Sequence, residues 1–416
     1  MNIVVKFKPL KDPFFLQLFS ANFMSVIGDT IYRITLVYSA FFLGGATNLG
    51  AVFASQTLTI FVTVLFAGSL TSFFRSKSIL VLSVLIRALL SLFLLFLMIK
   101  GVQLIYAFII LGIFFGLSES LFRPAYQELF KINVKKDLFE ESVSLISLSR
   151  QTVNIIGPVI GGFLISFFSV EISVLIIFFS FLTSAFLIVN LNETKKKDNG
   201  NSKSNFSIVE VTREVREGIL FVRNTKWLLF GISIAFFSVP IQQALSTVVV
   251  PTFIFDLGGN EKLYSVLLSS YAVGALTGGF VFLHIGKKLR SIKIVISFLV
   301  FGYCMYSVLG FFQGTIEIVV IGFFIGVFFQ LYSVSWENFT LLYVEERYIA
   351  RTASVQWFVF NALAPISIAL FSIIVEYVGG ENIIRYAALF ALIGIITISI
   401  IFRVGSLDFG NQGDRG

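Results

Sequence analysis

The chain has 416 residues, of which 57% are hydrophobic and only 13% are charged. Its mean hydropathy is +0.93, and a soluble domain carries about 25% charged residues, so a water-soluble fold is excluded. A single cysteine and a single histidine exclude a disulfide within the chain and a metal site rich in either residue. The formal net charge is +8, and the positions of the basic residues along the chain, described below, account for it.

Apolar runs long enough to cross a bilayer recur from one end of the chain to the other. A transmembrane helix needs about 20 apolar residues, and these runs are continuous, unlike the alternating pattern of barrel strands. The sequence predicts an all-α polytopic membrane protein with an N-terminal six-helix bundle (residues 1–192), a cytoplasmic central loop (193–226) and a C-terminal six-helix bundle (227–416). The expected transmembrane helices are residues 14–43, 49–71, 79–99, 104–122, 143–168, 172–191, 227–250, 263–285, 292–312, 316–339, 353–375 and 383–402.

The basic residues are distributed very unevenly between the expected loops. If the N-terminus is cytoplasmic, only Lys100, Lys262 and Arg385 fall in outer loops, and nearly all other Lys and Arg residues lie inside. Short cytoplasmic loops retain basic residues, so we expect both termini to be cytoplasmic in a multi-pass protein of a bacterial cell membrane. Contact of these loops with anionic lipid explains the net charge, and no nucleic-acid partner is expected.

The two halves of the sequence repeat each other weakly. Gly112–Gly116 in the fourth span matches Gly322–Gly326 in the tenth at an offset of about 210 residues, and Leu43–Gly45 matches Leu257–Gly259 at about 214. Both halves begin on the same side of the membrane, so the repeat is parallel. Transporters built in this way place their substrate site between the halves, near the middle of the membrane.

The expected fifth helix carries a motif of small residues. It contains Gly157, Pro158, Gly161 and Gly162 in the sequence V-N-I-I-G-P-V-I-G-G-F-L. Glycine permits close helix packing and proline removes a backbone hydrogen bond. The motif resembles the fifth-helix signature of major facilitator superfamily antiporters, in which such a helix is thin and bendable. We expect this helix at the interface of the two halves. The alternative is that these are ordinary glycine and proline residues of a membrane helix, without a special role.

The resemblance extends along nearly the whole chain, to the macrolide-efflux and enterobactin-exporter-like branch of that superfamily. The residues that carry it are Gly28-Asp29, Arg87-Ala88-Leu89, Pro124-Ala125, the segment 216–222, Gly274-Ala275-Leu276 and Arg351. One feature departs from the superfamily pattern, because Gly68 is followed by Ser72 where an acidic residue is usual. Arg75 and Lys77 keep the basic character of this expected cytoplasmic gate.

Four charged residues fall inside expected spans of the N-terminal half. Asp29 and Arg33 are four residues apart on one helix face, and Arg87 and Arg150 lie within the third and fifth spans. Each would cost a few kcal/mol if it faced lipid, so all four must face protein or water. We expect Asp29 to couple protons or bind a substrate cation with Arg33 as its partner; a static buried ion pair is the alternative. The two other arginines would face carboxylates or substrate anions, and a purely structural role is the alternative for Arg87.

Further polar residues are expected at a gate and in a central cavity. Glu119 and Arg123, four residues apart near the end of the fourth span, are interpreted as a gate pair, with a role in coupling as the alternative. Trp336 and Glu337 are expected to close the equivalent side of the second half, with an interface anchor as the alternative for the tryptophan. Gln242 and Gln243 match Gly28 and Asp29 under the repeat, and are expected to bind substrate or to join helices.

The favoured function is secondary active transport: proton-driven efflux of amphiphilic small molecules such as antibiotics, siderophores or peptide natural products. No cofactor is expected beyond the proton gradient, and the protein is expected to be monomeric. A lysophospholipid transporter of the same fold is the first alternative. A membrane enzyme is disfavoured because the acids are scattered and the single cysteine and histidine supply no nucleophile and base.

Overall fold

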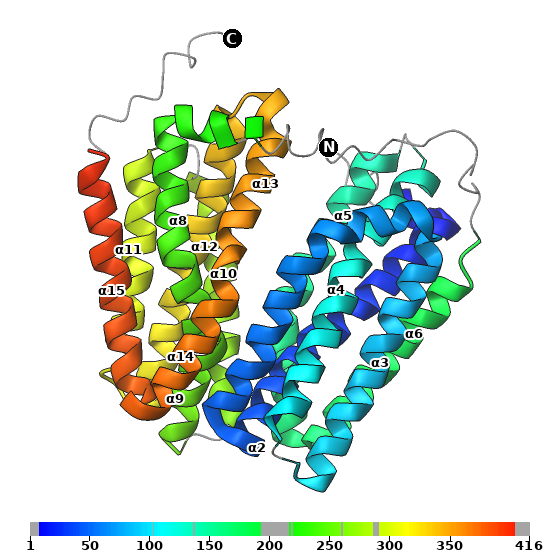
Figure 1. Ribbon diagram of the computed structural model, residues 1–416, viewed down its shortest axis with the longest axis horizontal. Helices are drawn as coiled ribbons and strands as arrows, with labels where there is room; N and C mark the ends of the chain where they lie inside the picture. The colour runs from blue at the N-terminus through cyan, green and yellow to red at the C-terminus, as the bar shows by residue number, and fades with distance from the viewer. Residues whose placement is uncertain are drawn as a thin grey trace. The chain divides into compact units, whose positions relative to one another are not determined.

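The computed structural model describes residues 8–102, 104–135, 138–192, 216–217, 219–258, 261–285 and 291–403. The chain divides into two compact units, Met1–Ser204 and Asn205–Gly416, and the division falls inside the expected central loop. Helices make up both units, and no strand occurs in the described ranges (Figure 1). The all-α membrane fold predicted from the sequence is therefore confirmed.

The first bundle consists of one short and five long helices. They are η1 (Lys8–Lys11), α2 (Pro13–Phe73), α3 (Ser76–Lys100), α4 (Ile105–Asn133), α5 (Phe139–Phe167) and α6 (Val170–Val189). Helix α2 contains the first two expected spans, joined at a kink where Gly44 and Gly45 leave the helical conformation. Gly45 has φ 66°, a left-handed value that glycine adopts without strain. The Leu43–Gly45 repeat therefore marks a sharp turn in the backbone.

The second bundle begins with a span built from three consecutive elements. These are α8 (Lys226–Ala244), the π-helix η3 (Leu245–Val249) and α9 (Val250–Asp256). The bundle continues with α10 (Glu261–Ile285), α11 (Ile292–Leu309), α12 (Thr315–Tyr343), α13 (Glu346–Ala362), α14 (Ala364–Val378) and α15 (Gly380–Ile401). Gly258, which belongs to the matching glycine pair, also has a positive φ of 70°.

Ten helical segments in the described part of the chain are long and apolar enough to cross a membrane. The first of them, Pro13–Thr63, lies on both sides of the kink in α2 and so covers two expected spans. Helix α5, which is not among the ten, corresponds to the remaining expected span. The structure therefore accommodates every span that the sequence predicted.

Glycines hold the same pair of helices together in each bundle. A Cβ atom on Gly116 of α4 would lie 2.5 Å from the carbonyl oxygen of Gln56 in the second part of α2. In the second bundle, a Cβ on Gly326 of α12 would meet the carbonyl oxygen of Tyr271 in α10. Both contacts are backbone to backbone, so only glycine fits at either position. This equivalence supports the internal repeat read from the sequence.

Candidate functional site

A buried ion pair lies in the interior of the first bundle. Arg87 of α3 is 1% exposed, and its Nη1 donates to both carboxylate oxygens of Asp29 in α2, at 3.0 Å and 2.8 Å. The Asp29 side chain is 31% exposed. The arginine is therefore sealed inside the bundle, whereas the side chain of the aspartate that neutralises it is partly exposed.

Neighbouring helices supply further partners to the Arg87 guanidinium. Nη1 also donates to Ser25 Oγ at 3.1 Å, while Nε and Nη2 donate to the Oγ and the carbonyl oxygen of Ser118 in α4. The ring of Phe122 lies 4.9 Å from the guanidinium carbon, and two other phenylalanine rings lie within 6.0 Å. Asp29 is the one anion bonded to Arg87 among the described residues.

The expected pairing of Asp29 with Arg33 is not the one that the structure contains. Arg33 is exposed, and the ion pair of Asp29 is with Arg87. The spacing of four residues correctly places Asp29 and Arg33 on one face of α2, but the nearest donor comes from a different helix. The interpretation of Arg87 as an inward-facing residue with a carboxylate partner fits the structure.

Glu119 lies in the middle of α4 rather than at its end. The helix continues past Pro124 to Asn133, although the apolar run stops near Phe122. Glu119 Oε2 accepts a hydrogen bond from Gln56 Nε2 at 3.1 Å, and Arg123 is exposed. The structure therefore joins Glu119 to α2 and does not contain the Glu119–Arg123 pair expected from their spacing.

The basic residues after the second span lie around the start of α3. Arg75 immediately precedes the helix and is exposed, while Lys77 Nζ donates to the carbonyl oxygen of Leu191 after α6, at 2.8 Å. Both residues line a cavity of about 640 Å³. Gly68 and Ser72 lie in the stretch 64–73, whose side chains are outside the described part of the structure.

The glycines of the fifth helix pack inside the first bundle. A Cβ on Gly157 would collide with Thr30 of α2, and one on Gly161 would lie 2.9 Å from Ile34 Cδ1. Gly162 is also buried. The closest contacts of these glycines are with the first helix of the same half, and the expected position of the motif between the two halves stays a prediction. The side chain of Pro158 is outside the described residues.

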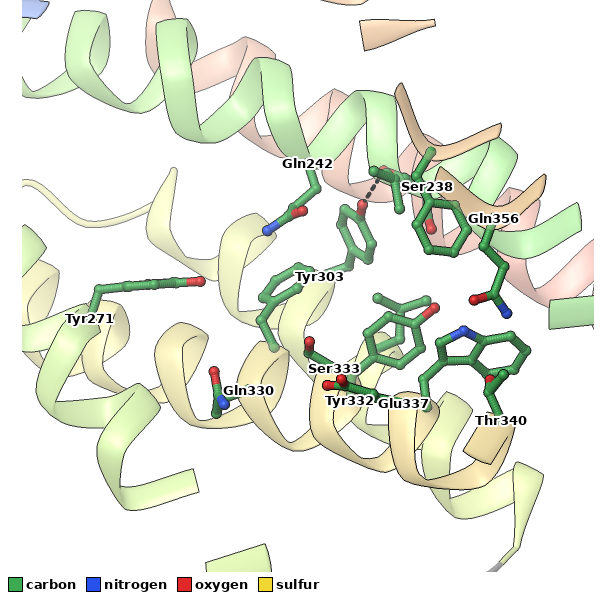
Figure 2. A pocket seen from close by; sticks show the side chains of 15 residues that line it. Ser238, Gln242, Tyr271, Tyr303, Gln330, Tyr332, Ser333, Glu337, Thr340 and Gln356 are labelled. Atoms are coloured by element: carbon green, nitrogen blue, oxygen red, sulfur yellow. Dashed lines mark hydrogen bonds between the residues drawn. The ribbon is translucent and has the colours of Figure 1, made fainter. Parts of the chain in front are cut away.

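The second bundle contains a partly open cavity of about 550 Å³ (Figure 2). Its lining combines hydroxyl groups, amides and aromatic rings from five helices, α8, α10, α11, α12 and α13. The residues are Ser238, Val239, Gln242, Tyr271, Leu299, Tyr303, Phe329, Gln330, Tyr332, Ser333, Trp336, Glu337, Thr340, Gln356 and Phe360. Glu337 is the one charged residue among them, and its side chain is exposed. The cavity is therefore polar and nearly uncharged.

Several buried polar atoms of this cavity have no hydrogen-bond partner among the described residues. They are Ser238 Oγ, Trp336 Nε1, Thr340 Oγ1 and Gln356 Nε2. Tyr303, in contrast, donates to the carbonyl oxygen of Ser238 (Figure 2). A buried polar group without a partner costs about 1–3 kcal/mol. A ligand that carries hydrogen-bond acceptors would remove this cost.

The residues that the sequence singled out in the second half make different contacts in the structure. Trp336 is 5% exposed, packs on Gly231 and lies edge-on to Trp227. Gln242 lines the cavity, whereas Gln243 Nε2 donates to the carbonyl oxygen of Phe360 at 3.4 Å. The lining residues of α10, α11 and α13 were missed. Single tyrosine and glutamine residues inside apolar runs, such as Tyr303 and Gln356, are the sequence feature that could have indicated this cavity.

Comparisons with known proteins identify the fold and the family. The model of the Major Facilitator Superfamily matches residues 18–368. The nucleoside transporter NupG is 15% identical with a TM-score of 0.70, over 94% of this chain and 100% of that one. A bacterial homologue of the iron transporter ferroportin, in an inward-facing state, is 13% identical with a TM-score of 0.72, over 98% and 100%.

A bacterial homologue of the human lysosomal transporter Spinster is 13% identical with a TM-score of 0.69, over 95% of this chain and 98% of that one. Among curated proteins, none matches the chain by sequence. At these identities the structural likeness shows the fold alone. The branch of the superfamily, and with it the substrate, has to be argued from the residues of this chain.

Proposed function

The chain belongs to the Major Facilitator Superfamily, and from that premise we propose that this membrane transporter is a proton-driven exporter of amphiphilic small molecules. The substrates would be compounds such as antibiotics, siderophores or peptide natural products. The observation that carries the proposal is the pairing of a sealed arginine, Arg87, with the partly exposed Asp29.

Protonation of Asp29 in this pair would change which conformation of the protein is favoured. While Asp29 is ionised, the charge of Arg87 is neutralised across two hydrogen bonds from Nη1. Protonation of the carboxylate would leave the buried guanidinium without a counter-charge, which is unfavourable in a low-dielectric interior. The first bundle would then favour an arrangement in which Arg87 finds another anion or water. A proton thereby shifts a conformational equilibrium, which is what coupling requires.

The cavity of the second bundle suits the binding of an amphiphile. Aromatic rings such as Tyr303 and Phe329 supply apolar surface, and the unpaired Trp336 and Thr340 groups supply hydrogen bonds. Ligand sites commonly combine apolar walls with a few directed polar groups. The energy source in this proposal is the proton gradient, without a cofactor, and the transporter acts as a monomer.

We also propose an orientation for the chain in a bacterial membrane. Both termini and the central loop are on the cytoplasmic side because the basic residues concentrate there. A cysteine in place of Ser202 should react with an impermeant thiol reagent only from the cytoplasm, and one in place of Thr47 only from outside. Reaction of the Ser202→Cys protein in intact cells would contradict this orientation.

Inside-out vesicles test the proposed function directly. The substrates are anionic, neutral and cationic amphiphilic fluorophores, offered with and without an imposed pH gradient. We expect at least one of them to accumulate against its concentration gradient and to leave when nigericin dissipates the pH gradient. Uptake of lysophosphatidylcholine in place of the fluorophores would favour the lysophospholipid alternative. Transport of every compound only down its own gradient would contradict proton-driven export.

A further inference from the structure

The start of α3 and the end of α6 lie side by side at one end of the first bundle (Figure 1). Lys77, in the first turn of α3, donates from Nζ to the carbonyl oxygen of Leu191, just after the end of α6, at 2.8 Å. An open cavity of about 640 Å³ lies at this junction, and its lining residues all come from these two segments. Ligand pockets commonly have volumes of about 300–1,000 Å³, so the cavity is large enough to bind a lipid headgroup.

Two cations line this cavity, and its lining contains no acidic residue. The cations are Arg75 and Lys77, and neither forms an ion pair with another described residue. Arg75 is exposed, while Lys77 uses one of its three N–H donors on the backbone. Ser78 and Asn192 add a hydroxyl group and an amide to the lining. The cavity therefore favours a ligand with a net negative charge over a zwitterion, whose ammonium group the two cations would repel.

The rest of the cavity wall is apolar and continues along the exposed face of α3. Val81, Leu82 and Leu85 line the cavity from α3, and Val189 lines it from α6. Leu82, Leu85 and Val189 are 57%, 38% and 54% exposed, and Leu89, the next exposed leucine of α3, is 65% exposed. Residues spaced three or four apart lie on one side of a helix, so the α3 leucines form a row. The cavity thus joins a cationic end to a surface on which an acyl chain can lie.

The cationic end of the cavity lies at the boundary of a membrane-crossing helix. The segment Ser76–Lys100 is long and apolar enough to cross a bilayer, and Arg75 and Lys77 are at its first residues. This is the level at which the hydrocarbon core gives way to the headgroup layer. The cytoplasmic leaflet carries anionic lipids that attract basic residues at its surface. In the proposed orientation, the start of α3 lies in that leaflet.

We propose that this cavity is a binding site for one anionic phospholipid of the bilayer, such as phosphatidylglycerol. The phosphate binds to Arg75 and Lys77, and one acyl chain lies along the leucine row that begins at Leu82. The cations select the charge of the ligand, and the apolar row selects a lipid over a free phosphate. The ligand belongs to the surrounding membrane and is not the transported molecule, so the site does not depend on the proposed function.

Native mass spectrometry of the full-length protein tests the site. Protein in a neutral detergent is titrated with phosphatidylglycerol, with phosphatidylcholine of the same acyl chains, and with glycerophosphoglycerol, the water-soluble headgroup without acyl chains. We expect the first phosphatidylglycerol to bind at least about fivefold more tightly than the first phosphatidylcholine, which is the effect of about one basic residue at an anionic membrane surface. Glycerophosphoglycerol should not bind measurably at the same concentrations, because it has no apolar part.

Variants of the two cations locate the binding. Arg75→Gln and Lys77→Gln should each weaken phosphatidylglycerol binding about fivefold and leave phosphatidylcholine binding within about twofold of the native value. Lys100→Gln is the matched control, because it removes the same charge from the other end of α3, outside the cavity lining, and should leave the preference unchanged. If Lys77→Gln fails to fold without its bond to Leu191, Arg75→Gln carries the test alone, since Arg75 is exposed and forms no ion pair with a described residue.

Each of four results would overturn the proposal. The first is equal affinity of the native protein for phosphatidylglycerol and phosphatidylcholine, and the second is an unchanged preference in the Arg75→Gln protein. The third is a loss in the Lys100→Gln protein as large as that in the cavity variants, which would show a general effect of charge. The fourth is binding of glycerophosphoglycerol as tight as that of phosphatidylglycerol, which would show a site for soluble phosphate esters.

Discussion

The two bundles share their helix packing but differ in their polar interiors. Gly116 and Gly326 bring equivalent helices to backbone contact in the two halves. Inside the first bundle, however, the polar groups are ionic, with Arg87 bonded to Asp29. Inside the second, hydroxyl groups, amides and rings line a cavity in which Glu337 is the one charged residue.

This difference distinguishes the helix-packing positions, which are alike in the two halves, from the interior polar residues, which differ. A glycine against a carbonyl oxygen tolerates no side chain, so the packing positions are restricted to one residue type. Side chains that point into the interior have no such restriction and can diverge between the halves. Under the proposed function, the first bundle responds to protons through charge, and the second binds the apolar and hydrogen-bonding parts of the substrate.

The largest expected effect follows from removing the buried cation. Arg87→Met deletes the donor of five hydrogen bonds, and breaking a buried ion pair costs about 3–5 kcal/mol. We expect the yield of monodisperse protein, measured by size-exclusion chromatography, to fall severely. Tyr303→Phe, the neutral counterpart in the second bundle, should cost only about 1 kcal/mol. Equal yields for the two variants would contradict the contrast between the bundles.

A smaller and symmetrical effect is expected at the packing glycines. Gly116→Ala and Gly326→Ala each place a methyl group against a backbone carbonyl, and we expect each to destabilise its bundle by about 1–3 kcal/mol. Gly279→Ala is the control because a Cβ there has nothing within 4 Å. Thermal unfolding of the purified variants measures the effect. A lower midpoint for only one of the first two would show that the shared packing is not equally important.

The smallest effect concerns one hydroxyl group of the cavity. Thr340→Val replaces an unpaired, buried hydroxyl with a methyl group, so the free protein should be at least as stable while substrate affinity falls about threefold to tenfold. Thr352→Val is the matched control, since Thr352 Oγ1 is also buried without a partner but lies outside the cavity lining. Equal affinities of the two variants for an exported fluorophore would exclude Thr340 from the binding site.

The sequence predicted the spans well because long apolar runs and basic loops are local signals. The repeated Leu-Gly-Gly segments were predicted only as a repeat, and the structure adds that Gly45 and Gly258 both adopt positive φ. The partner of Asp29 could not be predicted in the same way. Spacing along one helix indicates which residues share a face, but Arg87 approaches from α3, and the packing of helices against one another is not a local property.

Two other features lay beyond sequence reasoning for similar physical causes. The apolar run ends near Phe122, but α4 continues to Asn133, so Glu119 lies in the middle of the helix and not at its end. The cavity of the second bundle gathers single polar residues from five helices. Each of them, such as Gln356, resembles an ordinary helix residue until the helices are assembled.

The central claim is that Asp29 couples proton movement to transport, and proteoliposomes with an imposed pH gradient test it most directly. Asparagine has the shape and neutrality of a protonated aspartic acid, so Asp29→Asn should hold the first bundle in its proton-bound arrangement. We predict that this variant loses uphill transport driven by the pH gradient but retains exchange of labelled for unlabelled substrate. Gradient-driven transport by Asp29→Asn at the wild-type rate would contradict the account.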